Sequence, residues 1–493
     1  MPAQDFKTLT YTAALDDSVR RRVRRWMMAS TALLLLSGCA SFSPDGGMSV
    51  VTATVSQDLG KNAAALRTSN EAAAARSTTA RLLSKPLSAD AAVQIALLNN
   101  RGLQAAYNEL AIAEAQAVEG SLPPNPAISL SRIAGSVEVE VERKIVANVL
   151  ALATLPVRSE IAAARFRQAQ IVALSETLRV AADTRRAYYR AVSARELAGF
   201  LAQAQSGAET AAKFATRLGE TGGMNKLDQA REQVFYADLT AQLATARQRA
   251  ASEREALIRA MGLWGDDLAF RMGIALPPLP SRPQSLPGIE TEAVRRHVDL
   301  QIGRIELDAL AKSYGLTQAT RFINVLDAGL TGKTFRDKAT GEKARERGFD
   351  VELQVPIFDF GEVRVREAEA TYMHAVNRLT ERAVNVRSEA RDAYRSYRSS
   401  YDIANHYQRE VLPLRKIISD ETLLRYNGML IDVFSLLAEA RQRIAATTAA
   451  IEARRDFWLA TTNLNTAVMG GGVLGRGEAA RAMSGASAEA PQH

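Results

Sequence analysis

The sequence predicts a mainly α-helical protein with a small β part, built from long α-helical hairpins and four strands per chain. Three observations predict this fold class. Two helical segments are far longer than a compact domain holds, short segments of alternating polarity interrupt the helices, and one half of the chain resembles the other at a shift of about 200 residues. The internal two-fold repeat therefore replaces the count of about three domains that length alone suggests.

The first residues are typical of a bacterial lipoprotein signal. A basic cluster, residues 20–25, precedes a short apolar core from about Trp26 to Leu36, and Leu36-Ser37-Gly38-Cys39 resembles a lipobox around the only cysteine. Residues 1–38 are therefore expected to be removed, and Cys39 to carry fatty acyl chains such as palmitate. Ala40, rather than an aspartate, indicates the outer membrane by the enteric sorting rule. The alternative is a chance cysteine in a signal-anchor helix, although about 11 apolar residues are too few to span a bilayer.

Composition excludes several classes of site and partner. Residues 1–38 hold six basic and three acidic side chains, which leaves about +5 of the net charge of +8 for the mature chain. Its bases alternate with acids, so no nucleic-acid partner is expected. One cysteine excludes an internal disulfide, and four scattered histidines predict no metal site. Acidic residues within 1–19 leave the true translation start open. No apolar stretch of 18 residues follows the signal, so any membrane-spanning part must be β.

The repeat defines the domain organisation. Leu227-Asp228-Gln229-Ala230-Arg231 matches Leu437-Ala438-Glu439-Ala440-Arg441, and each half is expected to run helix, two strands, very long helix, turn and long helix. The predicted segments are a signal peptide (1–38), a lipidated N-terminal arm (39–86), a first repeat (87–276), a Pro-rich linker (277–288), a second repeat (289–470) and a disordered tail (471–493).

Two helical rods dominate the repeats. Residues 159–216 contain no proline and only one glycine, which predicts a helix of about 85 Å. The matching rod, Glu362 to Arg425, is interrupted only by Pro413, where we expect a kink. Rods of this length indicate a coiled coil or a helical tube.

The return helices favour a tube. One stripe runs through Leu227, Ala230, Val234 and Ala237, and a second through Leu239, Leu243, Ala246 and Ala250. Two Ala-rich stripes suit a helix with neighbours on both sides in a cylinder wall. The alternative is an ordinary solid bundle.

The strand segments lie between the helices of each half. Residues 127–133 and 137–142 form the first pair, and 322–335 and 349–355 the second, joined by a polar loop from Arg336 to Gly348. Alternation of apolar and polar residues fits a barrel wall with lipid outside and a wet lumen inside. Four strands are too few for a barrel, so closure requires several copies of the chain. The alternative is a soluble four-stranded cap on a helical stalk.

Several short motifs occur in the order found in one protein family. They are residues 87–93 with Asn99-Asn100, Leu122 to Pro126, Val355 to Gly361, Tyr407 to Pro413, and Tyr426-Asn427-Gly428 with Leu436-Leu437-Ala438. In this pattern the chain resembles the TolC-type outer-membrane efflux proteins, the outer membrane factors, in their lipidated branch. One departure is Leu155-Pro156-Val157-Arg158-Ser159, where the family often has a glycine-containing turn.

The resemblance implies a homotrimer with a 12-stranded transmembrane barrel and a 12-helix periplasmic tunnel. It implies that the chain is a passive channel of a tripartite efflux system, and its partners would be outer-membrane lipid, a periplasmic adaptor and an inner-membrane pump, of the RND type rather than an ABC pump. The adaptor would meet the helix-turn-helix tips. The expected contact residues are Gly219, Gly222, Gly223, Leu227, Tyr426, Asn427, Gly428 and Leu430.

No enzymatic chemistry or cofactor is expected, because no nucleophile, base and acid are grouped and no phosphate loop is present. Asp228 and Asp432 are candidate gate residues, since carboxylates converging on a pore axis focus a strong field; the alternative is that both are solvated residues at helix starts. Met224 and Met429 hint at copper, or are incidental. Alternative functions are the duct of a type I protein secretion system and a structural periplasmic coiled-coil lipoprotein.

Overall fold

The computed structural model describes residues 42–472, which fold into two compact units. The β unit consists mainly of residues 115–162 and 323–355, and the helical unit of residues 44–114, 163–322 and 356–472. Cys39 and most of the expected disordered tail lie outside the described residues. Within residues 42–472, no helix combines the length and apolar character that a membrane span requires.

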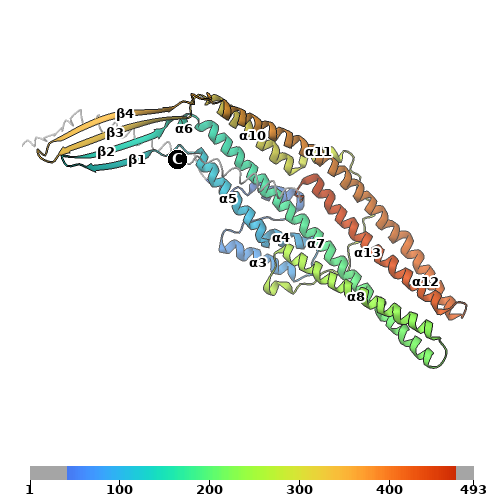
Figure 1. The fold of residues 1–493 in the computed structure, drawn as a ribbon. Coiled ribbons are helices and arrows are strands. Elements are labelled where there is room, and N and C mark those ends of the chain that lie inside the picture. Colours follow the sequence, from blue (N-terminus) through green and yellow to red (C-terminus); the bar gives the residue numbers. More distant parts are fainter. Residues whose placement is uncertain (1–41, 473–493) are drawn as a thin grey trace, which may run out of the picture. The chain divides into compact units, whose positions relative to one another are not determined.

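The β unit contains one antiparallel sheet with the strand order β1-β2-β3-β4 (Figure 1). The strands are β1 (Ala127–Ala134), β2 (Glu138–Asn148), β3 (Val325–Asp337) and β4 (Lys343–Gln354). Ile145 of β2 pairs with Ile128 on one side and Leu330 on the other, and Leu330 pairs with Phe349. The sheet is open, because β1 and β4 each have a strand neighbour on one side only.

The second hairpin corrects one prediction. The expected loop from Arg336 to Gly348 is wrong in extent, since β3 continues to Asp337 and β4 already begins at Lys343. The start of β4 is not predicted from the sequence, because residues 343–348 are mostly charged and Ala344 is their only apolar residue. The turn is short because the Asp337 carboxylate accepts hydrogen bonds from the backbone N–H groups of residues 339 and 340, at 2.7 and 2.9 Å. The strand β2 likewise extends beyond the predicted residues 137–142.

Long helices form most of the helical unit (Figure 1). They are α7 (Leu155–Glu220), α8 (Lys226–Met261), α11 (Glu362–His406), α12 (Leu412–Asn427) and α13 (Val433–Met469). The uninterrupted rod predicted over residues 159–216 is confirmed, because α7 has 66 residues. Pro156 lies in its first turn, a position that needs no backbone N–H donor.

The second rod is interrupted where proline predicts. A π-helical turn, η3 (Tyr407–Val411), separates α11 from α12, and Pro413 is the second residue of α12. Proline has no N–H to donate to the carbonyl four residues earlier, so the preceding turn loses its regular hydrogen bond. The irregularity therefore precedes the proline.

Shorter elements complete the fold. They are α2 (Ser49–Thr54), η1 (Val55–Leu59), α3 (Ser69–Leu83), α4 (Ala89–Asn99), α5 (Arg101–Ser121), α6 (Val149–Ala153), η2 (Gly265–Leu268), α9 (Ile289–Arg296) and α10 (Val298–Ala319). The order of helix, strand pair and long helices occurs twice along the chain. The N-terminal arm is packed rather than loose, since Val51 and Val55 are fully buried against a core that includes Leu103 and Tyr107 of α5.

The Pro-rich linker, residues 277–288, contains no helix. It lies along the helical unit, where the indole N–H of Trp458 donates to the Pro277 carbonyl at 3.1 Å and the Tyr401 hydroxyl donates to the Pro280 carbonyl at 3.1 Å. The linker is therefore fixed to α13 and α11.

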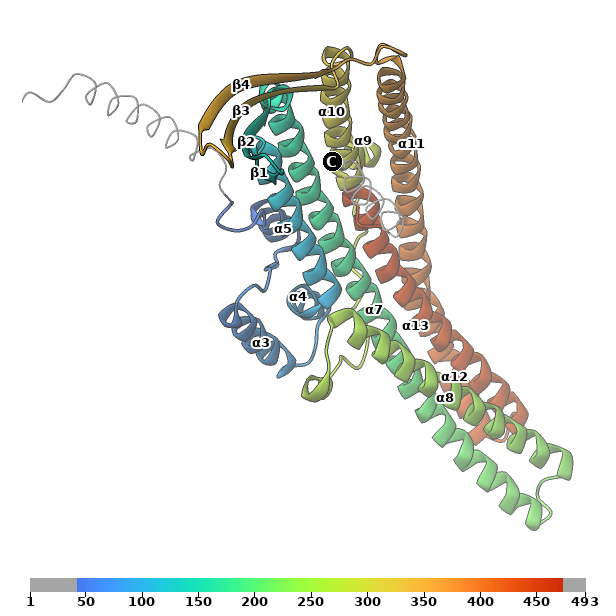
Figure 2. The ribbon, with the colours of Figure 1, turned by 60° about the vertical axis from the view of Figure 1, so that its left-hand side comes forward.

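The two stripes of α8 have different surroundings. Leu239 and Leu243 are buried in a cluster that includes Leu201 of α7 and Leu437 of α13. In the other stripe, Leu227 is 61% exposed and Val234 is 56% exposed. The α7–α8 hairpin lies beside the α12–α13 hairpin (Figure 2). The stripe with Leu239 and Leu243 is therefore buried between helices of the chain, and the stripe with Leu227 and Val234 faces outward.

Candidate functional site

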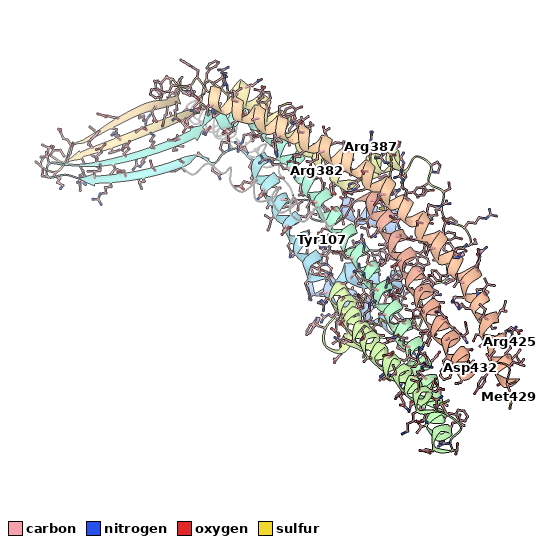
Figure 3. The ribbon with its side chains drawn as sticks, turned by 45° about the vertical axis from the view of Figure 1, so that its right-hand side comes forward. Tyr107, Arg382, Arg387, Arg425, Met429 and Asp432 are labelled. Atoms are coloured by element: carbon pink, nitrogen blue, oxygen red, sulfur yellow. The ribbon has the colours of Figure 1, made fainter. Side chains whose placement is uncertain are left out.

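The candidate site comprises the two turns that join the long helices. The first tip, residues 217–231, joins α7 to α8, and the second tip, residues 424–435, joins α12 to α13. Figure 3 shows Arg425, Met429 and Asp432 together at the end of the second hairpin. All the predicted adaptor-contact residues lie in these two tips.

The first tip is closed by a pair of reverse-turn hydrogen bonds at the end of α7. The Gly223 N–H donates to the Leu218 carbonyl at 2.8 Å, and the Gly222 N–H donates to the Gly219 carbonyl at 3.1 Å. This is a Schellman motif, which requires a left-handed residue after the helix. Gly222 supplies it with φ of +78°. Gly219 lies against the Gln229 amide, which donates to the Met224 carbonyl at 3.1 Å.

The second tip has the same hydrogen bonds but a different residue at the left-handed position. The Leu430 N–H donates to the Arg425 carbonyl and the Met429 N–H to the Tyr426 carbonyl, both at 2.9 Å. Met429 has φ of +57°, while the preceding Gly428 has an ordinary negative φ. The Met429 side chain is 93% exposed, so nothing in the described chain packs on it.

Both candidate gate aspartates have local partners at helix starts. Asn225 caps α8 by accepting from the Asp228 N–H at 2.9 Å, and its side-chain amide donates to the Asp228 carboxylate at 2.6 Å. Asp432 caps α13 and accepts from the Ser435 N–H at 2.8 Å and the Ser435 hydroxyl at 2.7 Å. The Ser435 backbone N–H lowers the pKa of Asp432 below its ordinary value. Each carboxylate is thus held close to a helix N-terminus.

Two arginine–phenylalanine contacts join the hairpins, one within the tips and one just beyond them. The Arg231 guanidinium of α8 lies 5.4 Å from the Phe434 ring centre of α13, and the Arg441 guanidinium of α13 lies 4.8 Å from the Phe235 ring centre of α8. The internal repeat aligns Arg231 with Arg441, but the sequence predicts no partner for either. The aligned arginines were the available signal for this reciprocal contact.

A buried carboxylate lies near the same contacts. Glu232 is 2% exposed, and neither of its carboxylate oxygens has a hydrogen-bond partner. Burial raises the pKa of Glu232, while the positive charge of Arg441 opposes that shift. Glu232 lines a cavity of about 400 Å³ together with apolar side chains of α7 and α13 and with Met224 and Tyr426 of the tips. The burial of Glu232 is not predicted from the sequence, because a glutamate on an Arg- and Gln-rich helix is expected at the surface.

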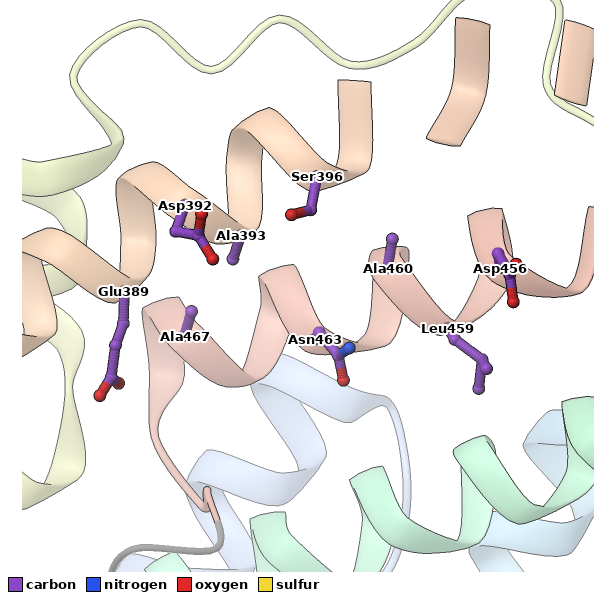
Figure 4. A pocket seen from close by; sticks show the side chains of 9 residues that line it. All are labelled: Glu389, Asp392, Ala393, Ser396, Asp456, Leu459, Ala460, Asn463 and Ala467. Atoms are coloured by element: carbon purple, nitrogen blue, oxygen red, sulfur yellow. The ribbon is translucent and has the colours of Figure 1, made fainter. Parts of the chain in front are cut away.

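A second hollow of about 300 Å³ lies between α11 and α13 (Figure 4). Its acidic residues do not converge, since Glu389 and Asp456 lie at opposite ends of it. Burial raises the pKa of Glu389. Among residues 42–472, no group of three histidine, cysteine, aspartate or glutamate side chains is placed to hold a metal ion. The role of Met224 and Met429 in copper binding stays a prediction.

The sheet of the β unit has one strongly polar face. On it, Lys144 lies 2.8 Å from the Asp350 carboxylate, and Lys333 lies 2.9 Å from that of Glu140. Residues directly opposite one another share a face, so the strand register assigns eight acids and these two lysines to this side. The acids are Glu138, Glu140, Glu142, Asp327, Asp337, Glu346, Asp350 and Glu352.

Comparison with protein-family models and with curated proteins finds no match. Solved structures do match. The Campylobacter jejuni CmeC outer membrane channel has a TM-score of 0.67 at 16% identity, covering 78% of this chain and 86% of CmeC. The open state of the Neisseria gonorrhoeae MtrE outer membrane channel has 0.62 at 16%, covering 77% and 88%. The Vibrio cholerae outer membrane protein VceC has 0.61 at 14%, covering 78% and 96%.

The chain therefore has the fold of these outer-membrane proteins. The fold predicted from the sequence, that of the TolC-type outer-membrane proteins, is confirmed. Identities this low establish the fold alone.

Proposed function

We propose that this protein is the outer-membrane channel of a tripartite efflux system. It would conduct substrates passively to the outside, with the energy supplied by an inner-membrane pump. The observation that carries the proposal is the open, two-faced sheet attached to long helical hairpins, in a fold shared with outer-membrane channels. A polar face and an apolar face on one sheet suit a wall between water and lipid.

The strand order supports the proposal that several copies close a barrel. The strands alternate in direction, so β4 of one chain runs antiparallel to β1 of the next when identical copies are arranged in a ring. Exposed strand edges favour such pairing. A single chain has four strands and a membrane barrel needs at least eight, so at least two copies are required. Three copies give the 12-stranded barrel that the resemblance implies, and the protein is proposed to be a homotrimer.

The helical unit would form the periplasmic tunnel. At 1.5 Å per residue, the 66 residues of α7 extend about 100 Å. The exposed stripe of α8, with Leu227 and Val234, is available to a neighbouring chain in a cylinder wall. The two tips would contact the periplasmic adaptor of an RND-type pump. Acylation of Cys39 would add a lipid anchor in the outer membrane.

The test is conduction by the whole protein. Purified, acylated chain in mild detergent is expected to have the mass of a trimer by light scattering and to form ion-conducting pores in planar bilayers. A monomer that forms no pores contradicts the proposal. Co-purification with an adaptor and an RND-type pump supports efflux. Co-purification with a secreted protein supports a type I secretion duct.

A double substitution tests the hypothesis that Asp228 and Asp432 are gate residues. Asparagine caps helices as well as aspartate does, so Asp432→Asn keeps the cap of α13. Asp228→Asn leaves Asn225, the cap of α8, in place, so the double variant removes two charges per chain and keeps both turns. If six carboxylates close the pore, this double variant raises the single-channel leak conductance several-fold. Asp238→Asn, at an exposed position of α8, is the matched control and leaves the conductance unchanged. Equal conductance in all three proteins rules out the aspartates as gate residues.

A further inference from the structure

The apolar face of the sheet carries a segregated set of charges. Alternation places residues 128–134 (even), 139–147 (odd), 326–336 (even) and 343–353 (odd) on this face. It holds no acid at all. It holds six bases, Arg132, Arg143, Arg336, Lys343, Arg345 and Arg347. All the acids of the four strands therefore lie on the opposite face.

The bases occupy one end of the face. One row across the four strands, Ile128, Ile145, Leu330 and Phe349, is wholly apolar. The next three rows toward the hairpin turns contain the six bases. They are Leu130 with Arg143, Gly332 and Arg347; Arg132 with Val141, Thr334 and Arg345; and Ala134 with Val139, Arg336 and Lys343. We call these three rows the basic band. An apolar band thus adjoins a basic band, in the direction of the turns.

Within residues 42–472, the basic band has no counter-charge at ion-pair distance. All six side chains are exposed, and within the described part of the chain none forms an ion pair. This contrasts with the polar face, where both lysines contact carboxylates. Long basic side chains beside an apolar surface extend their charged ends toward an interface. Arginine, which supplies five of the six, binds phosphate oxygens through two parallel hydrogen bonds.

We propose that the basic band binds the phosphate-bearing headgroups of anionic lipids in the leaflet that surrounds the strand turns, while the adjoining apolar band contacts their acyl chains. The inference rests on the proposed function, since it requires the sheet to lie in a bilayer. Charge complementarity favours a lipid over a protein partner, because a row of apolar side chains followed by rows of cations matches the order of tail and phosphate in one lipid molecule. A phosphate surface also attracts each cation close to it.

The experiment measures lipid selection by the full-length protein. The protein is reconstituted in phosphatidylcholine vesicles that contain spin-labelled phosphatidylglycerol or spin-labelled phosphatidylcholine. Electron spin resonance then gives the association constant of the labelled lipid at the protein surface. The wild type is expected to prefer phosphatidylglycerol by about three- to tenfold in low salt. The preference should fall in 1 M salt, where charges are screened within about 3 Å.

Three variants separate the band from the rest of the protein. Combining Arg143→Gln, Arg345→Gln and Arg347→Gln is expected to bring the preference close to one. The same three positions changed to lysine keep most of it. The charge-matched control combines Arg247→Gln, Arg259→Gln and Arg282→Gln, at exposed positions of the helical unit, and keeps all of it.

Pore formation in neutral phosphatidylcholine bilayers is measured on every variant. Pores without any lipid preference in the wild type, or a preference that the glutamine variant retains, contradict the lipid assignment alone. Absence of pores from the wild type contradicts the proposed function itself. Retention of a nucleic-acid oligomer by the band, without lipid selection, also overturns the assignment.

Discussion

At the scale of single residues, the two tips differ at one backbone position. Gly222 and Met429 both occupy the left-handed conformation that ends a Schellman motif. For a residue with a Cβ this conformation costs about 1–2 kcal/mol. The methionine therefore places strain in the second tip that the first tip lacks, and no packing compensates for it, because its side chain is exposed.

Met429→Gly is expected to stabilise the second hairpin by about 1 kcal/mol, since glycine removes the strain and the exposed side chain makes no contact to lose. Hydrogen exchange of the amides at the end of α12 and the start of α13 measures the change as increased protection. The reciprocal change, Gly222→Met, should reduce protection at the first tip by a similar amount. Unchanged exchange in both variants contradicts the strain argument.

Glu232 is a second residue in an energetically unfavourable environment. A buried carboxylate without hydrogen-bond partners costs free energy in its charged form, which is the reason its pKa is raised. Below its ordinary pKa of about 4.5, the side chain is protonated in both folded and unfolded chains and carries no penalty. As pH rises above 4.5, the unfolded chain ionises first, and the folded protein loses stability until Glu232 also ionises.

Glu232→Met should therefore raise stability at pH 7.5, by about 1–2 kcal/mol, and the gain should shrink as pH falls toward 4.5. Thermal unfolding of the full chain in detergent at both pH values measures it. Asp238→Asn on the same helix is the control, and an exposed substitution of this kind changes stability by less than about 0.5 kcal/mol. A gain that does not depend on pH points to packing instead of charge.

At the scale of elements, helices were more predictable than strands. The length of α7 and the interruption before Pro413 follow from the presence or absence of single residue types, which act locally on the backbone. The start of β4 at Lys343 was not predictable in this way, because its residues pair with β3 through register and carry no apolar alternation of their own.

The candidate site shows the same division. Glycine, asparagine and aspartate mark the turns, so the positions of both tips were accessible from the sequence. The contacts across the hairpins were not. Arg231 reaches Phe434 and Arg441 reaches Phe235 over about 200 residues of sequence, and no local pattern specifies such a pair. Two stripes on α8 were visible, but which one is buried within the chain depends on α13.

At the scale of the whole molecule, the two faces of the sheet determine what the proposed channel conducts. The polar face has an excess of six negative charges per chain, since eight acids accompany two lysines. In the proposed ring of copies, these faces would surround one lumen. A lumen lined by one sign of charge concentrates the opposite ions.

The channel should therefore select cations. Reversal potentials in a salt gradient near 0.1 M are expected to give a potassium-to-chloride permeability ratio of roughly 3–10, falling toward one near 1 M salt as screening shortens the range of the charges. Glu138→Gln with Glu346→Gln neutralises two acids of the polar face that lack ion pairs in the described chain, and should lower the ratio. Arg345→Gln, next to Glu346 but on the apolar face, should leave the ratio unchanged. Anion selectivity, or an equal response to both substitutions, shows that the acidic face does not line the lumen.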